Sequence, residues 1–280
     1  MDRVVAIIVT YNRPEFLRKL LLTLNNEDIE KIIVVDNSEK KYEYFLPNNA
    51  LLISTDNNLG GAGGYALGIK RSAEFNPDFL WLLDDDAIPQ VGALKILLDH
   101  HRRFKQEGID VGYLCSKVLW ADTNELCKMN IPTFVKNSAN QVLSCSFVSI
   151  LIQYDKIIKV GLPYKEFFIW YDDVEYTNRL SKISFGLFVE DSIVRHYTSN
   201  NLGADFGYIN DSNIIKYAHG IRNTVFCHIK DGRFKKLYRL FFRVRREMLS
   251  KSIPKKYRFF IYKWYLKGMI FHPTVEYLTN

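Results

Sequence analysis

Residues 4–10 read VVAIIVT, a near-continuous run of apolar and mostly β-branched side chains. A strand with one wet face alternates apolar with polar residues, whereas a strand covered on both faces is apolar throughout. The run therefore predicts a strand with helices on both sides of its sheet. This feature directs the chain toward an α/β fold.

Helical and strand-like segments alternate after this run. Pro14 opens the helical pattern RPEFLRKLLLTLNN, and proline is well accommodated in a first helical turn. Such alternation predicts a parallel sheet with right-handed crossovers, in which ligands bind beyond the carboxyl ends of the strands. The further predicted strands are 32–35, 51–54, 79–83, 111–120 and 146–152. Two later helices are predicted, one that ends at about residue 105 and one that spans 172–182.

Three polar motifs follow predicted strands: TYNR at 10–13, DNS at 36–38 and DDD at 84–86. Because the carboxyl ends of parallel strands meet at one edge of the sheet, we expect one site to gather all three. Asp84 and Asp86 stand at i and i+2 on a tight turn, where both carboxylates can reach one hard divalent cation. A solvated acidic turn is the alternative interpretation.

The segment DNNLGGAGGYA at 56–66 places four glycines just before a predicted helix. Glycine allows backbone amides to approach a ligand closely, and a helix N-terminus favours an anion. Asn58, Gly60 and Gly61 are therefore candidate donor-binding residues. The segment matches neither the dinucleotide fingerprint nor a Walker A motif, and a tight turn packed beneath a strand explains it equally well.

The segment FFIWYDDVEYTNRL at 167–180 combines aromatic and acidic residues. Asp172, Asp173 and Glu175 fall at a predicted helix start, where the helix dipole alone would favour carboxylates. The functional interpretation is a general base whose pKa is raised by desolvation beside Trp170 and Tyr171, which could also stack against a sugar.

His196 ends the strand-like segment SIVRHYTS. Imidazole suits Mn²⁺, so the sequence offers His196 as a metal ligand, with a purely structural histidine as the alternative.

In their order and spacing these motifs resemble the family 2 inverting glycosyltransferases, which have the GT-A fold. The resemblance rests on IIVTYNRPEFLRKLLLTL, IIVVDNS, DNNLGGAGG, WLLDDDAIP, FFIWYDDVEYTNRL, VRH and YAHGIRN, and it runs from residue 4 to 226. Bacterial galactofuranosyltransferases are most similar, followed by rhamnosyltransferases of surface-polysaccharide pathways. The expected layout is a GT-A catalytic domain at 1–228, with a nucleotide-sugar half to about 110 and an acceptor half from about 111, then a basic helical tail at 229–280.

The resemblance implies an inverting transfer of a sugar, galactofuranose favoured, from a UDP-sugar or a dTDP-sugar. It also implies a role for each motif in donor binding, metal binding, catalysis or acceptor contact. Thr10, Tyr11 and Arg13 would line the pocket for the base and ribose, and Asp36 would accept a hydrogen bond from the uracil or thymine ring. Asp84, Asp86 and His196 would hold Mn²⁺ or Mg²⁺ on the donor diphosphate, and Asp85 would contact the donor or support these ligands. Asp173 would be the catalytic base, and Asp172 beside it would bind acceptor or donor hydroxyls. Trp170, Tyr171 and Glu175 would contact the acceptor.

The positive charge of the chain is concentrated near its end. Residues 230–267 contain 14 basic and 2 acidic residues, which gives this stretch a net charge of +12. Since the whole chain has a net charge of +7, the rest of the chain is acidic. Apolar residues at 234, 237, 241, 244 and 248 recur at helical spacing between the cations. Basic, aromatic-rich amphipathic helices at 230–271 are suited to the surface of an anionic membrane. The alternative interpretation is a helical layer that packs on the catalytic domain or on another subunit.

The remaining composition fits this interpretation. The four cysteines show no paired spacing, which favours free thiols in a reducing compartment. The N-terminus lacks the pattern of a signal peptide, and no stretch approaches the roughly 20 apolar residues of a membrane span. We therefore expect a cytoplasmic protein, which the basic tail would place at the inner face of the cell membrane. The resemblance implies that it acts on a glycan or polyprenyl-diphosphate-linked acceptor in cell-surface polysaccharide synthesis. No nucleic-acid motif is present, and a homo-oligomer is left open.

Two other classes of function fit parts of the sequence. One is a catalytically silent sugar-nucleotide-binding scaffold on the same fold, against which the complete acidic set argues. The other is a nucleotidyltransferase, which also uses acidic metal clusters on α/β sheets. Release of nucleoside diphosphate from a sugar nucleotide would separate both from a glycosyltransferase.

Overall fold

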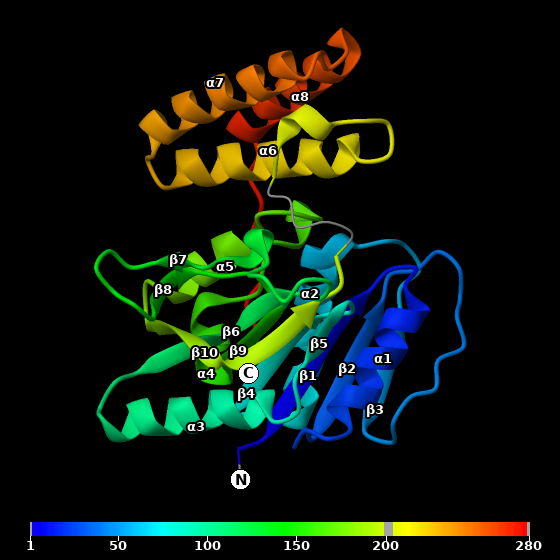
Figure 1. Cartoon of the computed structure of the whole chain (residues 1–280), viewed down its shortest axis with the longest axis vertical. Helices are drawn as coiled ribbons and strands as arrows, with labels where there is room; N and C mark the ends of the chain where they lie inside the picture. Colours follow the sequence, from blue (N-terminus) through cyan, green and yellow to red (C-terminus); the bar gives the residue numbers. More distant parts are fainter. Residues whose placement is uncertain (1, 199–203, 279–280) are drawn as a thin grey trace.

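The computed structural model describes residues 2–198 and 204–278. A mixed sheet forms its centre, helices cover both faces of the sheet, and three C-terminal helices form a further layer (Figure 1). The α/β elements are β1 (Val4–Thr10), α1 (Pro14–Leu24), β2 (Lys31–Asp36), β3 (Ala50–Ser54), α2 (Gly60–Ser72), β4 (Phe79–Asp84), β5 (Ala87–Pro89), α3 (Ala93–Gln106), β6 (Val111–Trp120), β7 (Thr133–Phe134), β8 (Gln141–Ser144), β9 (Ser149–Gln153), α4 (Tyr154–Val160), α5 (Asp172–Leu180) and β10 (Phe185–His196).

The sheet order is β3-β2-β1-β4-β9-β6-β10-β8-β7, with β5 paired to β10. The four strands from β3 to β4 are parallel, as the strand–helix alternation predicts. Strand β9 runs antiparallel to both β4 and β6, and β10 runs parallel to β6. The fold class is therefore the predicted mixed, mostly parallel α/β sheet.

Strand β1 explains why the VVAIIVT run is apolar throughout. Val4, Ala6 and Ile8 pack into the core beneath α1 and α3, whereas Val5 and Ile7 pack into the core beneath α2, α4 and α5. Successive side chains point to opposite faces, so burial of both faces demands apolar residues at every position.

One predicted strand is wrong in its first half. Strand β9 begins at Ser149, and the predicted start at 146–148 is a turn. Phe147 is nevertheless buried, because its ring packs edge-on against Tyr65 and Tyr176. The apolar character of this stretch therefore reflects burial of a turn, which short apolar runs do not distinguish from burial of a strand.

The C-terminal helical layer comprises α6 (Ile214–Lys230), α7 (Phe234–Ser250) and α8 (Lys255–Met269). Its own core includes Ile221 and Val225 of α6, Val244 of α7 and Ile261 of α8, so α6 is packed together with the two basic helices (Figure 1). The predicted boundary at 228/229 falls at the end of α6, inside this packed unit, and the division into domains stays a prediction. Among the described residues, none of the helices is long and apolar enough to cross a membrane.

The segment that follows α8 returns to the α/β part of the molecule. The carbonyl oxygen of Glu276 accepts a hydrogen bond from the amide of Leu162 at 2.8 Å, and the carboxylate of Glu276 pairs with Lys70 and Lys165. The segment that follows the helical layer is thus anchored on the α/β part.

Candidate active site

The carboxyl ends of β1, β2 and β4 lie in register. Thr10 stands beside Asp36 in the β1–β2 pair, and Val9 stands beside Asp84 in the β1–β4 pair. The structure thus gathers the three polar motifs at one edge of the sheet, where parallel α/β sheets bind ligands.

Asp84, Asp86 and His196 form a cluster, called the metal group below. One ligand atom from each residue lies within 4.8 Å of the others. His196 reaches the cluster because β10 pairs antiparallel with β5, which opposes His196 to Ala87, the residue after Asp86. Two carboxylates and an imidazole suit Mn²⁺ or Mg²⁺, so the residues present fit the predicted metal.

The imidazole of His196 is held from two sides. Its Nε2 lies 3.0 Å from Oδ1 of Asp86, and its Nδ1 lies 3.0 Å from Oδ1 of Asn130. Burial alone would lower the pKa of His196, but the hydrogen bonds to Asp86 and Cys127 and the charges of Asp86 and Asp84 raise it to about 10. A hydrogen-bond acceptor at Nδ1 fixes the orientation of the ring, so that Nε2 points toward the position of a metal. This is the usual arrangement for a histidine ligand. Asn130 was not among the predicted site residues, because it ends a short 3₁₀ helix (Lys128–Asn130) that contains no motif.

Asp85 belongs to a different set of contacts from its two neighbours. Its Oδ2 accepts a hydrogen bond of 2.7 Å from the hydroxyl of Thr10, and its Oδ1 lies 3.2 Å from Nη1 of Arg13. The same Nη1 lies 2.6 Å from Oδ2 of Asp86. Burial raises the pKa of Asp85 to about 7, although the charge of Arg13 opposes this. The triplet therefore separates into two carboxylates in the metal group and one that orients Thr10 and Arg13.

These contacts bear on the expected roles of Thr10 and Arg13. Thr10 is buried and its hydroxyl donates to Asp85, which indicates a supporting role for this side chain, and its contact with a ribose stays a prediction. Half of the Arg13 side chain is exposed beside the metal group, which suits contact with a phosphate better than contact with a base.

Asp36 and Tyr11 lie on the β2 side of the site. The carboxylate of Asp36 is buried and accepts hydrogen bonds from the amide of Ser38 and the hydroxyl of Tyr44, both at 2.9 Å. Tyr11 is exposed, with its hydroxyl 3.3 Å from Glu39. Their contact with a nucleotide base stays a prediction.

The glycine-rich segment serves close packing. Asn58 accepts a hydrogen bond from the amide of Gly60, and the amide of Ala62 donates to the carbonyl oxygen of Phe168. A Cβ at Gly60 would lie 2.0 Å from that same oxygen, and Gly60 has a φ of +69°. Two amides of the first turn of α2 are therefore used within the protein, which supports the tight-turn interpretation. A Cβ at Gly61 would lie 4.0 Å from the carboxylate of Asp172, so this turn adjoins the acidic helix start.

Asp172 and Asp173 begin α5. Burial raises the pKa of Asp173 to about 6, and the negative charge of Asp84 adds to the increase. Burial, together with the charge of Asp173, raises the pKa of Asp172 well above its usual range. Because the charge of Asp84 acts on both residues, the helix start and the metal group share one electrostatic environment. A carboxylate with a pKa near neutrality is suited to general base catalysis.

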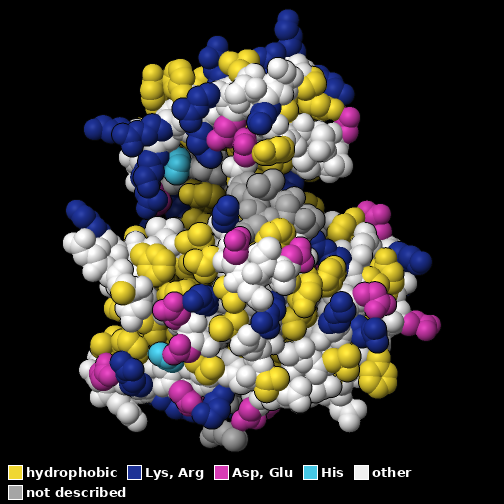
Figure 2. Space-filling model, viewed as in Figure 1, with side chains coloured by type: hydrophobic (Ala, Val, Ile, Leu, Met, Phe, Trp, Pro, Cys, Tyr) yellow, Lys and Arg dark blue, Asp and Glu magenta, His cyan; other side chains and the backbone are white. Residues whose placement is uncertain are grey.

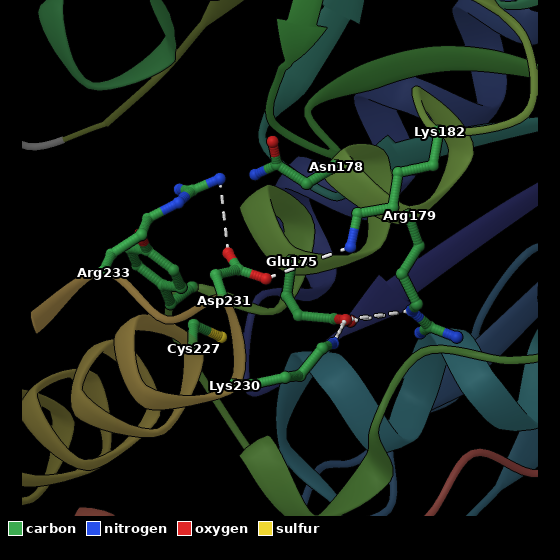
Figure 3. Close-up of a pocket in the computed structure, with 9 residues that line it drawn as sticks. Glu175, Asn178, Arg179, Lys182, Cys227, Lys230, Asp231 and Arg233 are labelled. Carbon is green, nitrogen blue, oxygen red and sulfur yellow. Dashed lines mark hydrogen bonds and ion pairs between the residues drawn. The ribbon is translucent and has the colours of Figure 1, made fainter.

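Glu175 does not have the predicted role. Its carboxylate is 4% exposed and forms ion pairs with Arg179 of α5 and Lys230 of α6 (Figure 3). A buried carboxylate that is already paired twice has no free face for an acceptor, so its expected acceptor contact is corrected to a contact between α5 and α6. Tyr171 lines the same pocket, together with Asn178, Lys182, Cys227, Asp231 and Arg233.

Trp170 is packed against the helical layer. Its ring is stacked on Phe206 at 6.2 Å and meets Tyr217 of α6 edge-on at 5.0 Å. Lys216 of α6 lies 5.9 Å from the same ring. Burial lowers the pKa of Lys216, and the charges of Arg13, Asp84 and Asp86 also act on it. Lys216 is therefore a further cation whose charge interacts with the metal group. It was not among the predicted site residues, because it lies before the YAHGIRN motif and outside the basic stretch 230–267.

The site thus combines an acidic turn at the strand ends, whose side chains could hold a metal, with two buried carboxylates at the start of a separate helix. Residues 5–127 match the family described as Glycosyl transferase family 2. The family predicted from the motifs is confirmed.

Mycobacterial galactofuranosyltransferases are among the similar proteins. The chain is 36% identical to galactofuranosyltransferase GlfT1 of Mycolicibacterium smegmatis over 92 residues, which is 31% of this chain and 30% of that protein. It is 27% identical to galactofuranosyltransferase GlfT1 of Mycobacterium tuberculosis over 205 residues, which is 66% of this chain and 67% of that protein. The match with the higher identity, to the M. smegmatis protein, thus covers less than a third of that protein.

Solved structures confirm the GT-A fold. GalNAc-T7 with UDP, GalNAc and Mn²⁺ superimposes with a TM-score of 0.59 at 12% identity, over 81% of this chain and 48% of that one. Residues 1–349 of S. aureus TarS in complex with UDP-GlcNAc superimpose with a TM-score of 0.53 at 16% identity, over 80% and 65%. At these identities the likeness shows a shared fold.

Proposed function

We propose that this protein is a metal-dependent inverting glycosyltransferase that moves a sugar, galactofuranose favoured, from a nucleoside diphosphate to an acceptor hydroxyl. The single observation that carries the proposal is that Asp173, a buried carboxylate with a raised pKa, is acted on by the charge of Asp84, a member of the metal group. The similarity to galactofuranosyltransferases supports the sugar, and UDP would be the expected nucleotide.

The reaction needs one base and no protein nucleophile. Asp173 takes the proton from the acceptor hydroxyl, whose oxygen attacks the anomeric carbon. The bond from that carbon to the diphosphate oxygen breaks as the new bond forms, and its electron pair leaves with the diphosphate. Because attack and departure occur on opposite faces, the anomeric configuration is inverted.

The other residues bind and orient. Mn²⁺ or Mg²⁺ held by Asp84, Asp86 and His196 would supply positive charge for the leaving diphosphate. Arg13, kept in place by Asp85, would contact a phosphate, and Asp36 with Tyr11 would bind the base. Asp172, buried beside the base, would position it or contact donor hydroxyls, and Trp170 would form one side of the acceptor site.

The donor can be tested without knowledge of the acceptor. Unfolding temperatures would be measured with Mn²⁺ and a panel that includes UDP-galactofuranose and dTDP-rhamnose, since a donor that binds the native state stabilises it by mass action. Stabilisation by the UDP-sugar supports the proposal, whereas a preference for dTDP-rhamnose would favour the rhamnosyltransferase alternative. Hydrolysis of the bound donor to nucleoside diphosphate, lost in Asp173→Asn, would exclude both a silent scaffold and a nucleotidyltransferase.

We further propose that the acceptor is a glycan carried on a membrane lipid such as a polyprenyl diphosphate, and that the protein works at the cytoplasmic surface of the cell membrane. Exposed aromatic side chains on α7 support this. Phe234, Tyr238 and Phe242 recur every four residues and are 65%, 66% and 46% exposed. Lys235, Lys236, Arg239 and Arg243 of the same helix are close to them in sequence, and Figure 2 shows many Lys and Arg side chains on the helical layer. An aromatic stripe flanked by cations is suited to the interface of an anionic membrane, where each cation contributes about 1 kcal/mol.

The membrane contact should be tested by substitution, because α7 and α8 share a core with α6 and their deletion would expose it. The triple variant Phe234→Ser, Tyr238→Ser, Phe242→Ser should lose most of its flotation with phosphatidylglycerol vesicles. The matched control changes Phe45, Val91 and Ile131, which are 87%, 72% and 53% exposed outside the helical layer, to serine. Equal flotation of the two variants would contradict the proposal.

A further inference from the structure

The backbone that leads into α5 has an unusual conformation. Phe168, Trp170 and Tyr171 all have positive φ, at +65°, +73° and +72°, although none is glycine. These residues immediately precede Asp172 and Asp173. Side chains rarely adopt this region, so the surrounding structure must hold the segment 166–171, called the base loop below.

Asn223 of α6 holds the base loop from one side. Its side chain is fully buried, and Nδ2 lies 3.0 Å, 3.3 Å and 2.8 Å from the carbonyl oxygens of Phe167, Ile169 and Trp170. Arg222 donates to the carbonyl oxygens of Glu166 and Phe167 and to Oδ1 of Asn223, which fixes the orientation of the amide. Buried carbonyl groups require such donors, and one amide here serves three of them.

Two glycines allow the base loop to be enclosed. A Cβ at Gly220 of α6 would lie 2.6 Å from the Trp170 ring, so only glycine lets α6 approach this closely. On the opposite side, Gly60 of α2 meets the carbonyl oxygen of Phe168. The base loop is therefore held between the glycine-rich turn of α2 and the face of α6 that carries Gly220 and Asn223.

We propose that Asn223 is a positioning residue for catalysis: by fixing the base loop it sets the position of Asp173 relative to the metal group. The proposal rests on the proposed role of Asp173 as base. It gives the YAHGIRN segment a function, because most of its residues contact the base loop. Gly220, Arg222 and Asn223 do so at the backbone or the Trp170 ring, and the rings of Tyr217 and His219 pack against Trp170 and Phe168. It also makes the helical layer a part of the active site.

Amide hydrogen exchange tests the proposal without any substrate. In Asn223→Ala, exchange over residues 166–175 should accelerate about tenfold, while exchange over β1 and β4 stays unchanged. The control is Thr224→Val on the same helix, because the Thr224 hydroxyl donates only to the carbonyl oxygen of Gly220 within α6. Unchanged exchange at 166–175 in Asn223→Ala would overturn the proposal, whatever the activity.

Kinetics separate positioning from general support of the fold. Asn223→Ala should lower kcat about 10- to 100-fold with little change in the donor KM, since a displaced base affects chemistry more than donor binding. Thr224→Val should retain the wild-type kcat. A fall in kcat that is matched by Thr224→Val, or that follows a loss of donor binding, would contradict a positioning role.

A second variant covers the case in which Asn223→Ala does not fold. Gly220→Ala introduces a methyl group against the Trp170 ring and should displace the base loop without removing a hydrogen bond. It should likewise accelerate exchange at 166–175 and lower kcat, and wild-type behaviour in both measurements would overturn the proposal. If the wild-type protein itself shows no turnover, the proposed function fails, and exchange still decides whether α6 holds the base loop.

Discussion

The α/β half and the helical layer contribute to the candidate site in different ways. The α/β half supplies charged groups at strand ends, where the register of β1, β2 and β4 places them side by side. The helical layer supplies mainly support: Asn223 binds carbonyl oxygens, Gly220 admits the Trp170 ring, and Lys230 pairs with Glu175. Its cation Lys216 is the one member of this set that acts on the metal group.

This difference indicates where substitutions should act. Changes at the strand ends and at Asp173 should remove the chemistry and leave the fold intact. Changes at the contacts of the helical layer should alter stability or the position of the base. The predictions below test this division in order of decreasing effect.

The largest effect is expected for Asp173→Asn. The amide keeps the size of the side chain but cannot take a proton, so kcat should fall by about 10² to 10⁴. Donor binding, measured as the rise in unfolding temperature with nucleotide and Mn²⁺, should be retained. The matched control is Asp155→Asn on α4, whose half-exposed carboxylate pairs with Lys156 and Lys159 and should not affect turnover. Retention of more than about a tenth of the wild-type kcat would contradict the role of Asp173.

The next effect is on stability. Glu175→Gln leaves Arg179 and Lys230 without their buried partner and should lower the free energy of unfolding by about 2–4 kcal/mol. Glu15→Gln removes an exposed pair with Arg18 and should cost less than about 1 kcal/mol. Urea unfolding curves of both variants provide the measurement. Equal losses would show that the contact between α5 and α6 is no stronger than a surface ion pair.

The pH dependence of kcat tests the base directly. The folded pKa of Asp173 is raised to about 6, above the usual carboxyl value of about 3.9. Since the base acts when deprotonated, kcat should be constant above this value and fall toward tenfold per pH unit below it. A cation at the metal group offsets the charge of Asp84, so the midpoint should lie no higher than about 6. A flat profile between pH 4 and 8 would exclude a carboxylate base.

Much of the α/β half could be predicted from the sequence because its rules are local. Apolar runs mark buried strands, and parallel strands bring their carboxyl ends together, so Asp36, Asp84 and Asp86 follow from position alone. The separate contacts of Asp85 could not be predicted, since adjacent residues on a turn give no direction for their side chains.

The helical layer was harder to predict because its roles depend on packing between distant segments. No chemical role followed from the sequence for Asn223 or Lys216, although Asn223 ends the YAHGIRN motif, because their partners outside α6 lie 46 or more residues away. The role of Glu175 was predicted wrongly although a local signal was present. Arg179 stands four residues after it on the same helix, which is the spacing of an intrahelical ion pair.

The smallest of these effects is expected for Lys216→Met, and it tests the division between the two regions most closely. The substitution keeps an unbranched side chain beside Trp170 but removes the cation near Asp84 and Asp86. If Lys216 contacts the donor diphosphate, the donor KM should rise about 5- to 30-fold in this variant, which is the usual loss for one charge-assisted hydrogen bond. The unfolding temperature of the donor-free protein should not change. Lys235→Met on α7 serves as control. An unchanged KM would confine the helical layer to support, whereas the expected increase would show that it also contributes a donor contact.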